Sequence, residues 1–337
     1  MRLVVLLSLG ILMILPAESF EPLTMTAIGF GIAGSAAYFR CKFTECCDDR
    51  SIPGNIGALR DSLDRTLFGQ HIVKQHVVAA LEAHFRSRST SRKPLVISFH
   101  GQPGTGKNFV ADQIAQALYL EGSKSGYVTK YLGQADFPNA DFVQYYKQRI
   151  SLEVRNQLGK CPRSLFIFDE VDKMPSGVFD TLASLADYNV FTDGTDNTKA
   201  IFIFLSNTAG KHIADHLGNL MKSGVLREET RLGDFEKLLK NAAYNLEGGL
   251  KQTALIESHV IDHFIPFLPM EQAHVVKCLE EEFWRWNMQP KKSAIAEILK
   301  NSISYDRKHN MFAISGCKTL EKKVAMVISD PYNPALT

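Results

Sequence analysis

The sequence predicts an α/β protein built on a parallel, doubly wound sheet and followed by a small, all-helical C-terminal domain. Apolar runs of strand length at 95–99, 164–168 and 200–205 alternate with longer segments of helical periodicity. Two prolines, Pro266 and Pro269, mark a boundary, and mainly helical patterns follow them. This alternation is typical of a parallel sheet that is covered by helices on both faces.

The first apolar run leads into a glycine-rich turn and then into a periodic helix. Strand, turn and helix in this order are the context of a P-loop, whose glycines let backbone N–H groups wrap around a phosphate. The helix N-terminus favours negative charge, and Lys107 supplies a point charge for the outer phosphates. A Gly/Pro turn that merely contains a lysine is the alternative. The expected nucleotide-binding residues are Gly101, Gln102, Pro103, Gly104, Thr105, Gly106, Lys107, Asn108 and Phe109.

Asn108 departs from the usual P-loop pattern, which has Ser or Thr at this place as a ligand of Mg²⁺. An amide oxygen can reach Mg²⁺ or one of its waters, so we expect Asn108 to serve as a metal ligand. The substitution weakens the match to a P-loop without excluding it.

The second apolar run ends in two adjacent carboxylates, Asp169 and Glu170, which fits a Walker B strand. Strand ends of this kind lie on the ligand side of an open α/β sheet. We expect Asp169 to hold Mg²⁺ and Glu170 to orient and deprotonate the attacking water. A solvated acidic turn is the alternative. The third run ends in Asn207, which would position the water or contact the γ-phosphate, unless it only terminates the strand.

The N-terminus predicts a secretory signal peptide at residues 1–19. Arg2 supplies the positive charge, an apolar stretch follows, and Ala17-Glu18-Ser19 fits a cleavage site. Residues 20–40 are uncharged apart from Glu21 and Arg40 and are short for a span, so we interpret them as a membrane-associating segment. A buried N-terminal helix is the alternative.

The rest of the chain divides into three predicted parts. Residues 41–58 form a linker or fixed N-terminal arm, residues 59–270 form the large nucleotide-binding domain, and residues 271–337 form a helical lid. The chain has 337 residues and a net charge of +2, which indicates no nucleic acid partner.

The six cysteines are an even number, which suggests disulfides in a protein of the secretory route. We expect Cys161 to pair with Cys41, Cys46 or Cys47, which would tie the N-terminal arm to the sheet domain. No spacing of Cys and His resembles a zinc site.

These residues together resemble an AAA+ ATPase of the Clp type, and more closely the torsins. The Clp branch is indicated by Phe68-Gly69-Gln70, followed in the expected order by the P-loop, the Walker B strand, a sensor-1 Asn207 and a lid. The torsins are indicated by the signal peptide with its weak hydrophobic segment, the Gly-Thr-Gly-Lys-Asn P-loop, and Gly316-Cys317-Lys318. The resemblance covers essentially the whole chain.

The torsin resemblance implies an ATPase that uses ATP and Mg²⁺ in the lumen of the endoplasmic reticulum and the perinuclear space, where it remodels proteins or membranes. Clp proteins carry an arginine finger where this chain has Val260. Arg227 and Arg231 are the nearest substitutes, but they lie in a charged stretch that we interpret as solvated surface. The resemblance therefore implies that a homo- or hetero-oligomer of this chain receives its arginine from the lumenal domain of a membrane-anchored activator.

The lid motif departs from the Clp pattern as well. Gly316-Cys317-Lys318 replaces Gly-Ala-Arg, so Lys318 would bring a charge to the nucleotide without the fork geometry of arginine. Cys278 lies on an earlier lid helix. A disulfide between Cys278 and Cys317 would couple redox state to nucleotide contact, and two buried free thiols are the alternative.

Two other functions stay open. A stand-alone Clp-like unfoldase would need an aromatic residue in a pore loop, and the stretch at 133–137 shows no Gly-aromatic-Gly pattern. A nucleotide-gated binding protein would use ATP only to control its assembly.

Overall fold

The computed structural model describes residues 3–8, 11–16, 41, 44–86, 91–187 and 196–329. The chain divides into a small unit, Met1–Cys46, and a large unit, Cys47–Thr337. In the small unit, β1 (Leu3–Ser8) pairs antiparallel with β2 (Ile11–Pro16), within the segment predicted to be a signal peptide. The predicted membrane-associating segment, 20–40, lies outside the described residues. Among the helices that are described, none has the length and apolar character needed to cross a bilayer.

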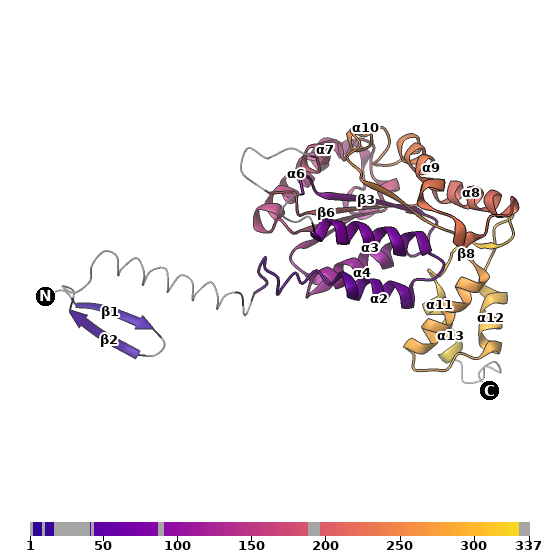
Figure 1. Ribbon diagram of the computed structural model, residues 1–337, viewed down its shortest axis with the longest axis horizontal. Helices are drawn as coiled ribbons and strands as arrows, with labels where there is room; N and C mark the ends of the chain where they lie inside the picture. Colours follow the sequence, from indigo (N-terminus) through magenta and orange to yellow (C-terminus); the bar gives the residue numbers. More distant parts are fainter. Residues whose placement is uncertain are drawn as a thin grey trace. The chain divides into compact units, whose positions relative to one another are not determined.

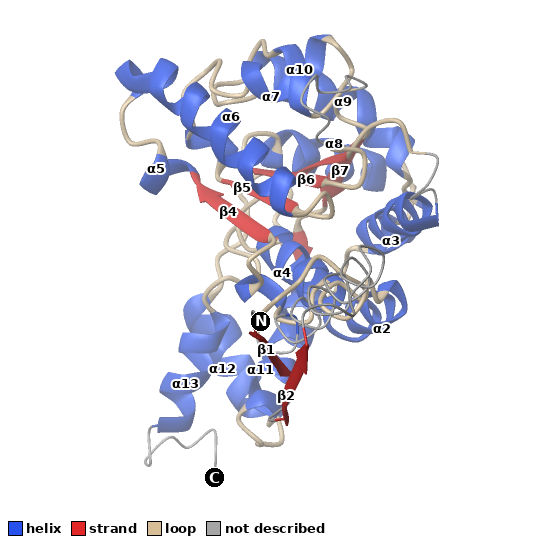
Figure 2. Ribbon diagram, turned by 90° about the vertical axis from the view of Figure 1, so that its left-hand side faces the viewer, coloured by secondary structure: helices blue, strands red, loops and turns tan. Residues whose placement is uncertain are grey.

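The large unit is built on a five-stranded parallel sheet with strand order β4-β5-β6-β3-β7. Figure 2 shows its strands in red, with β4, β5, β6 and β7 labelled. This topology confirms the predicted α/β class. The strands are β3 (Leu95–Gly101), β4 (Val128–Leu132), β5 (Leu165–Asp169), β6 (Ile201–Ser206) and β7 (His263–Phe267).

Strand β7 was not anticipated, because it contains a proline, Pro266, one residue before its end. Within the described part of the chain it lies at one edge of the sheet and pairs only with β3, where Pro266 stands opposite His100. An edge strand tolerates proline, since one side of its backbone needs no partner in the sheet.

Helices cover both faces of the sheet (Figure 1). One face packs against α2 (Ile56–Thr66), α3 (His71–Arg86) and α4 (Lys107–Leu118). The other face packs against α6 (Val143–Lys160), α7 (Asp180–Leu185), α8 (Gly210–Lys222), α9 (Leu232–Asn245) and α10 (Ala254–Glu257). Between β4 and α6 lies a short helix, α5 (Gly133–Asp136).

Alternation along the strands decides which side chain meets which layer. On β5, Phe166 and Phe168 join the core under α6–α9, whereas Leu165 and Ile167 join the core over α2–α4. Phe168 stacks on Phe204 of the next strand, with ring centroids 5.1 Å apart. Continuous apolar strands of this kind are expected where a parallel sheet is buried on both faces.

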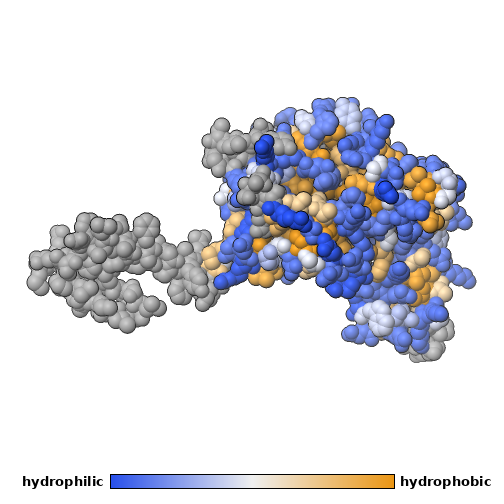
Figure 3. Space-filling view, viewed as in Figure 1, coloured by the Kyte–Doolittle hydropathy of each residue, from blue (hydrophilic) through white to orange (hydrophobic). Residues whose placement is uncertain are grey.

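The lid is a three-helix unit with a core of its own. It contains α11 (Gln272–Arg285), α12 (Lys292–Ser302) and α13 (Leu320–Ser329), with a small antiparallel pair, β8 (Met270–Glu271) and β9 (Phe312–Ala313). Val275, Leu279 and Phe283 of α11 are fully buried in this core. On the molecular face shown in Figure 3, hydrophilic residues dominate and apolar patches lie between them.

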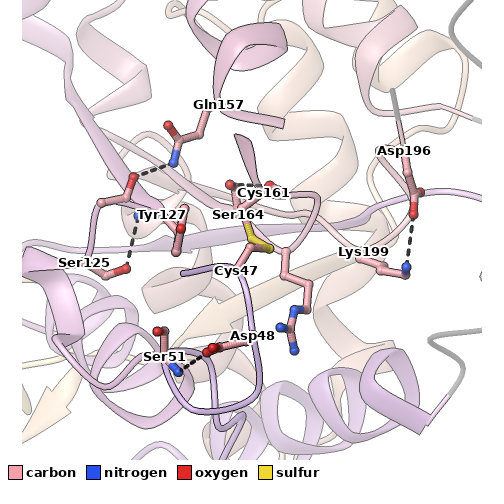
Figure 4. The surroundings of a disulfide bond; sticks show 12 residues. Cys47, Asp48, Ser51, Ser125, Tyr127, Gln157, Cys161, Ser164, Asp196 and Lys199 are labelled. Atoms are coloured by element: carbon pink, nitrogen blue, oxygen red, sulfur yellow. Dashed lines mark hydrogen bonds and ion pairs between the residues drawn. A yellow bond between two sulfur atoms is a disulfide. The ribbon is translucent and has the colours of Figure 1, made fainter. Parts of the chain in front are cut away.

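Three disulfides join the six cysteines in the pairs Cys41–Cys46, Cys47–Cys161 and Cys278–Cys317. The second pair is one of the three pairings that the sequence left open for Cys161. It bridges 114 residues and fastens the N-terminal arm beside the loop that leads into β5 (Figure 4). Arg163 adds an ion pair to Asp49 of the arm at 2.5 Å.

Candidate nucleotide-binding and hydrolysis site

The P-loop connects the end of β3 to the start of α4 and contacts the lid. Gly104 and Gly106 have φ angles of 78° and 104°, in the left-handed region that favours glycine. A Cβ on Gly104 would lie 1.9 Å from the carbonyl oxygen of Ser315 in the lid. Because no side chain fits there, glycine at this position permits both the phosphate-binding turn and the close approach of the lid.

Lys107 is the buried cation of this loop. Its Nζ donates to the carbonyl oxygens of Gly101 at 2.7 Å and Gln102 at 3.0 Å. Burial lowers the pKa of Lys107 to about 8, although the carboxylates of Asp172 and Asp169 act to raise it. The ammonium is thus held at the mouth of the loop, where a phosphate would supply the negative charge it lacks.

The remaining P-loop side chains have mainly structural contacts. Thr105 Oγ1 donates to the carbonyl of Gln102 at 2.8 Å, which closes the turn. The side-chain oxygen of Gln102 is buried and has no hydrogen-bond partner among the residues that the structure describes. Pro103 lies between the two inside the loop, and Phe109 packs partly against the core over α4.

Asp169 ends β5 with both carboxylate oxygens engaged. Oδ1 accepts the backbone N–H of Glu170 at 2.9 Å, and Oδ2 accepts the side-chain amide of Asn108. Lys130 on the adjacent strand places its Nζ 3.3 Å from the same Oδ2. No local sequence pattern singles out Lys130, because its contact depends on the pairing of β4 with β5.

The site fits a magnesium ion that arrives with a nucleotide. Asp169 and the amide oxygen of Asn108 are hard oxygen donors, and Mg²⁺ is usually bound by one or two such groups together with phosphates and water. Across the described residues, no group of three or more His, Cys, Asp or Glu side chains is arranged to hold a metal alone. Asp169 and Asn108 would therefore share the ion with the nucleotide.

Glu170 adopts a left-handed conformation, with a φ angle of 56°. Such strain in a residue other than glycine often marks a functional position. Its carboxylate accepts a hydrogen bond from Lys173 Nζ at 2.6 Å, and both side chains remain partly exposed. Lys173 thus engages one oxygen of the Glu170 carboxylate, Oε1.

Asn207 is oriented by an acidic residue that the sequence analysis missed. The backbone N–H of Asn207 donates to Asp172 Oδ1 at 2.9 Å, and its side-chain amide lies 3.4 Å from both carboxylate oxygens. Asp172 follows Glu170 by two residues, so the acidic run Asp169-Glu170-Val171-Asp172 was the available signal.

The lid motif lies directly against the P-loop. The N–H of Cys317 donates to the carbonyl of Gly104 at 3.0 Å. Lys318 follows, close enough for its charge to be among the causes that lower the pKa of Lys107. The Cys278–Cys317 disulfide, with a Cα–Cα distance of 6.2 Å, fixes this segment to α11.

Gln70 joins the P-loop to the end of β7. It is buried, and its amide nitrogen donates to the carbonyls of Thr105 at 3.1 Å and Leu268 at 2.8 Å. Its amide oxygen accepts the N–H of Leu268 at 2.9 Å. The Phe68-Gly69-Gln70 motif therefore fixes the P-loop to residues 268–271, which connect β7 to the lid and which we call the hinge.

The interpretation of Arg227 as solvated surface is wrong. Its side chain is 3% exposed, and Nη1 donates to the carbonyl of Pro269 and to Glu271 Oε1, both at 2.9 Å. Nη2 donates to the carbonyl of Gly69 at 2.7 Å. Arg227 therefore clasps the hinge, whereas Arg231 is exposed. This role of Arg227 has no local sequence pattern, because its three acceptors are distant in the sequence and two of them are backbone carbonyls.

The position of the Clp arginine finger points into the protein. Val260 is 1% exposed, and its carbonyl accepts a hydrogen bond from Lys93 at 2.6 Å. Arg227 and Arg231 were considered as substitutes for the finger. Arg227 is held at the hinge by its hydrogen bonds, whereas Arg231 is exposed.

Comparison with known proteins gives a consistent family and fold. A family model described as Torsin matches residues 41–168. A torsin-like protein of Drosophila melanogaster is 66% identical over 330 residues, which cover 96% of both chains. A torsin-like protein of Caenorhabditis elegans is 36% identical over 287 residues, which cover 84% of this chain and 80% of that one.

Solved structures of the Saccharomyces cerevisiae protein Hsp104 share the fold. The Hsp104–ADP complex superposes with a TM-score of 0.54 at 19% identity, over 81% of this chain and 47% of Hsp104. A closed state of Hsp104 with ATPγS and casein gives a TM-score of 0.52 at 16% identity, over 81% of this chain and 46% of that one. At such low identity the likeness concerns the α/β nucleotide-binding fold alone.

Proposed function

This chain belongs to the torsin family of AAA+ ATPases, and we propose that it hydrolyses ATP with Mg²⁺ only when a partner supplies an arginine. The observation that carries the proposal is that a buried valine, Val260, occupies the position of the Clp arginine finger. Val260 is buried, and Arg227 is held in the hinge by three acceptors. The groups for binding nucleotide and activating water nevertheless converge at the carboxyl ends of β3, β5 and β6.

Each residue of the site has a chemical role in this proposal. The P-loop backbone and Lys107 bind the phosphates, and Lys318 adds positive charge from the lid. Asn207, oriented by Asp172, positions the attacking water, and Glu170 accepts its proton. When bound, Mg²⁺ held by Asp169 and Asn108 would neutralise charge on the phosphate oxygens.

An arginine finger acts mainly in the transition state, where charge develops on the transferred phosphoryl group. Its contribution is on the order of 10³–10⁵ in turnover. Without it, the site retains its affinity for ATP but turns over close to background. We infer that a membrane-anchored activator donates this arginine from its lumenal domain.

The proposed location is the lumen of the endoplasmic reticulum and the perinuclear space, with residues 20–40 in contact with the membrane. The signal peptide pattern and the three disulfides support an oxidising compartment. In this location the chain, as a homo- or hetero-oligomer, remodels proteins or membranes. The net charge of +2 gives no support for a nucleic acid partner.

Single-turnover hydrolysis of ATP tests the proposal, with and without the lumenal domain of a candidate activator. We expect turnover near background for the chain alone and an increase of orders of magnitude in the complex, with little change in ATP affinity. Replacing the activator's arginine should preserve the complex and abolish the increase. Robust hydrolysis by the isolated chain, lost on Glu170→Gln, would overturn the proposal.

A nucleotide-gated assembly protein is the second candidate, favoured by the ion pair that holds Glu170 to Lys173. This candidate predicts that no activator domain raises turnover, although ATP still changes the oligomeric state. The unfoldase is not favoured, because Phe137 in the stretch after β4 is 2% exposed and packs in the core.

A further inference from the structure

Lys130 lies beside the carboxylate that is expected to hold the metal. The parallel register of β4 and β5 pairs Lys130 with Ile167 and Leu132 with Asp169. Tyr131, between these two β4 residues, points into the aromatic core, so Lys130 faces the opposite side of the sheet, toward the start of α4. From there its Nζ reaches to 3.3 Å from Asp169 Oδ2.

Asp169 is therefore neutralised by the protein itself. Its side chain is 10% exposed, and its three partners are the Lys130 ammonium, the Asn108 amide and the Glu170 N–H. A bare carboxylate in this place would repel the phosphates of a nucleotide that arrived without metal. Lys130 removes that repulsion, since it supplies a full positive charge at the point where Mg²⁺ would otherwise be needed.

The lysines around the site outnumber its carboxylates. Positive charge comes from Lys107 in the P-loop, Lys130 on β4, Lys173 after β5 and Lys318 in the lid, against the carboxylates of Asp169, Glu170 and Asp172. The site is thus electropositive before any metal arrives. The three carboxylates balance three of the four lysines, so these residues present one net positive charge to the nucleotide.

We propose that Lys130 is a resident counter-ion of Asp169 that lets this chain bind nucleotide with little dependence on Mg²⁺. The proposal rests on the nucleotide site proposed above and adds a residue that sets its metal requirement. Asp169 would hold Mg²⁺ through the same carboxylate that Lys130 contacts, so Lys130 would then have to give way. The Lys130 side chain is 34% exposed and flexible, so it can turn toward solvent and yield.

The test measures the affinity for ADP by isothermal titration calorimetry in excess EDTA and again in excess Mg²⁺. Wild-type protein should bind ADP in EDTA only a few-fold more weakly than in Mg²⁺. Lys130→Met keeps the aliphatic stem and removes the charge. We expect it to weaken ADP binding up to about fivefold in EDTA, the scale of one partly exposed charge interaction, and to leave binding in Mg²⁺ within about twofold.

Two further variants separate charge from structure. Lys130→Arg should retain the wild-type ratio between the two conditions, since it restores a cation beside Asp169. Lys240→Met removes another paired lysine, which lies 3.0 Å from Glu236 on α9, and should change neither affinity. Thermal unfolding of all variants checks that the fold is intact.

The possible outcomes are distinguishable. Equal affinities of wild type and Lys130→Met in EDTA would overturn the role of Lys130 and leave the proposed function intact. A wild-type protein that bound ADP in Mg²⁺ but not in EDTA would do the same. Failure of wild-type protein to bind ADP under either condition would instead overturn the nucleotide site itself.

Discussion

Replacing Arg227 should loosen the junction between the sheet domain and the lid. The guanidinium reaches three acceptors on separate segments, namely the carbonyl of Gly69 before α3, the carbonyl of Pro269 after β7, and the carboxylate of Glu271 at the start of the lid. Arg227→Met preserves much of the apolar stem but leaves all three acceptors without this donor.

The expected loss of stability follows from these contacts. Hydrogen bonds to charged groups contribute about 1.5–3 kcal/mol each, and breaking a buried ion pair costs about 3–5 kcal/mol. The three bonds share one side chain, and Glu271 is 28% exposed, so water can replace part of what it loses. We therefore expect a destabilisation of about 3 kcal/mol, near the lower end. For a unit of about 290 residues, an unfolding entropy of about 2.1 cal/mol/K per residue gives about 1.6 °C of Tm per kcal/mol, and hence a decrease of about 5 °C.

Thermal unfolding with and without ADP measures this effect, and Arg231→Met is the matched control because Arg231 is exposed four residues away. The control should unfold like the wild type. The double variant Arg227→Met/Glu271→Gln should lose less than the sum of the single variants, since the carboxylate is then no longer left unpaired. If Arg227→Met had the Tm of the wild type but an oligomer of this variant had lost hydrolysis, the stabilising role of Arg227 at the hinge would be refuted. Arg227 would then be an arginine finger that acts on a neighbouring subunit.

Three further predictions concern the site and the arm. Glu170→Gln should retain ATP binding and abolish activator-stimulated hydrolysis, whereas Lys107→Ala should lose affinity for ATP. Calorimetry measures the two affinities, and single-turnover hydrolysis measures the activity. Burial lowers the pKa of Lys107 to about 8 from 10.5, so ADP affinity should fall as pH rises through about 8. The ADP-free protein should gain stability from this group between about pH 8 and pH 10.5, because the unfolded chain binds more protons there. A pH-independent ADP affinity from 7 to 9.5 would contradict this. Cys47→Ser should cost about 4–5 kcal/mol on the chain-entropy model, and non-reducing peptide mapping of wild type that found Cys161 free would decide against the bridge.

Local patterns predicted the parts of the fold that depend on local physics. The periodic helix predicted after the glycine-rich turn corresponds to α4 (Lys107–Leu118), and the apolar run that ends in Asp169 corresponds to β5. The helix follows from its helical side-chain spacing, whereas β5, which is buried on both faces, follows from a short continuous apolar run. The P-loop was equally visible, since its glycines are required by the backbone of the turn.

Contacts between distant segments were beyond the reach of such patterns. Lys130 precedes Asp169 by 39 residues in the sequence, and only the register of β4 against β5 brings their charges together. Arg227 lies in a run of charged residues that reads as surface, yet its acceptors come from residues 69, 269 and 271. A charged side chain is classified as exposed by its type, whereas its actual burial depends on whether the fold supplies acceptors.

The absence of an arginine at residue 260 fits the packing of the whole segment and not only the replacement of one residue. The carbonyl of Val260 accepts from Lys93 at 2.6 Å, Lys93 also pairs with Asp262 at 2.7 Å, and Asp262 accepts the N–H of Val96 at 2.9 Å. These contacts fasten the segment to the start of β3 and turn residue 260 into the core. An arginine there would have to be buried without a partner or pull the segment away from β3, and either change is costly. The backbone around Val260 thus disfavours a finger from this position, which supports a donor on another chain.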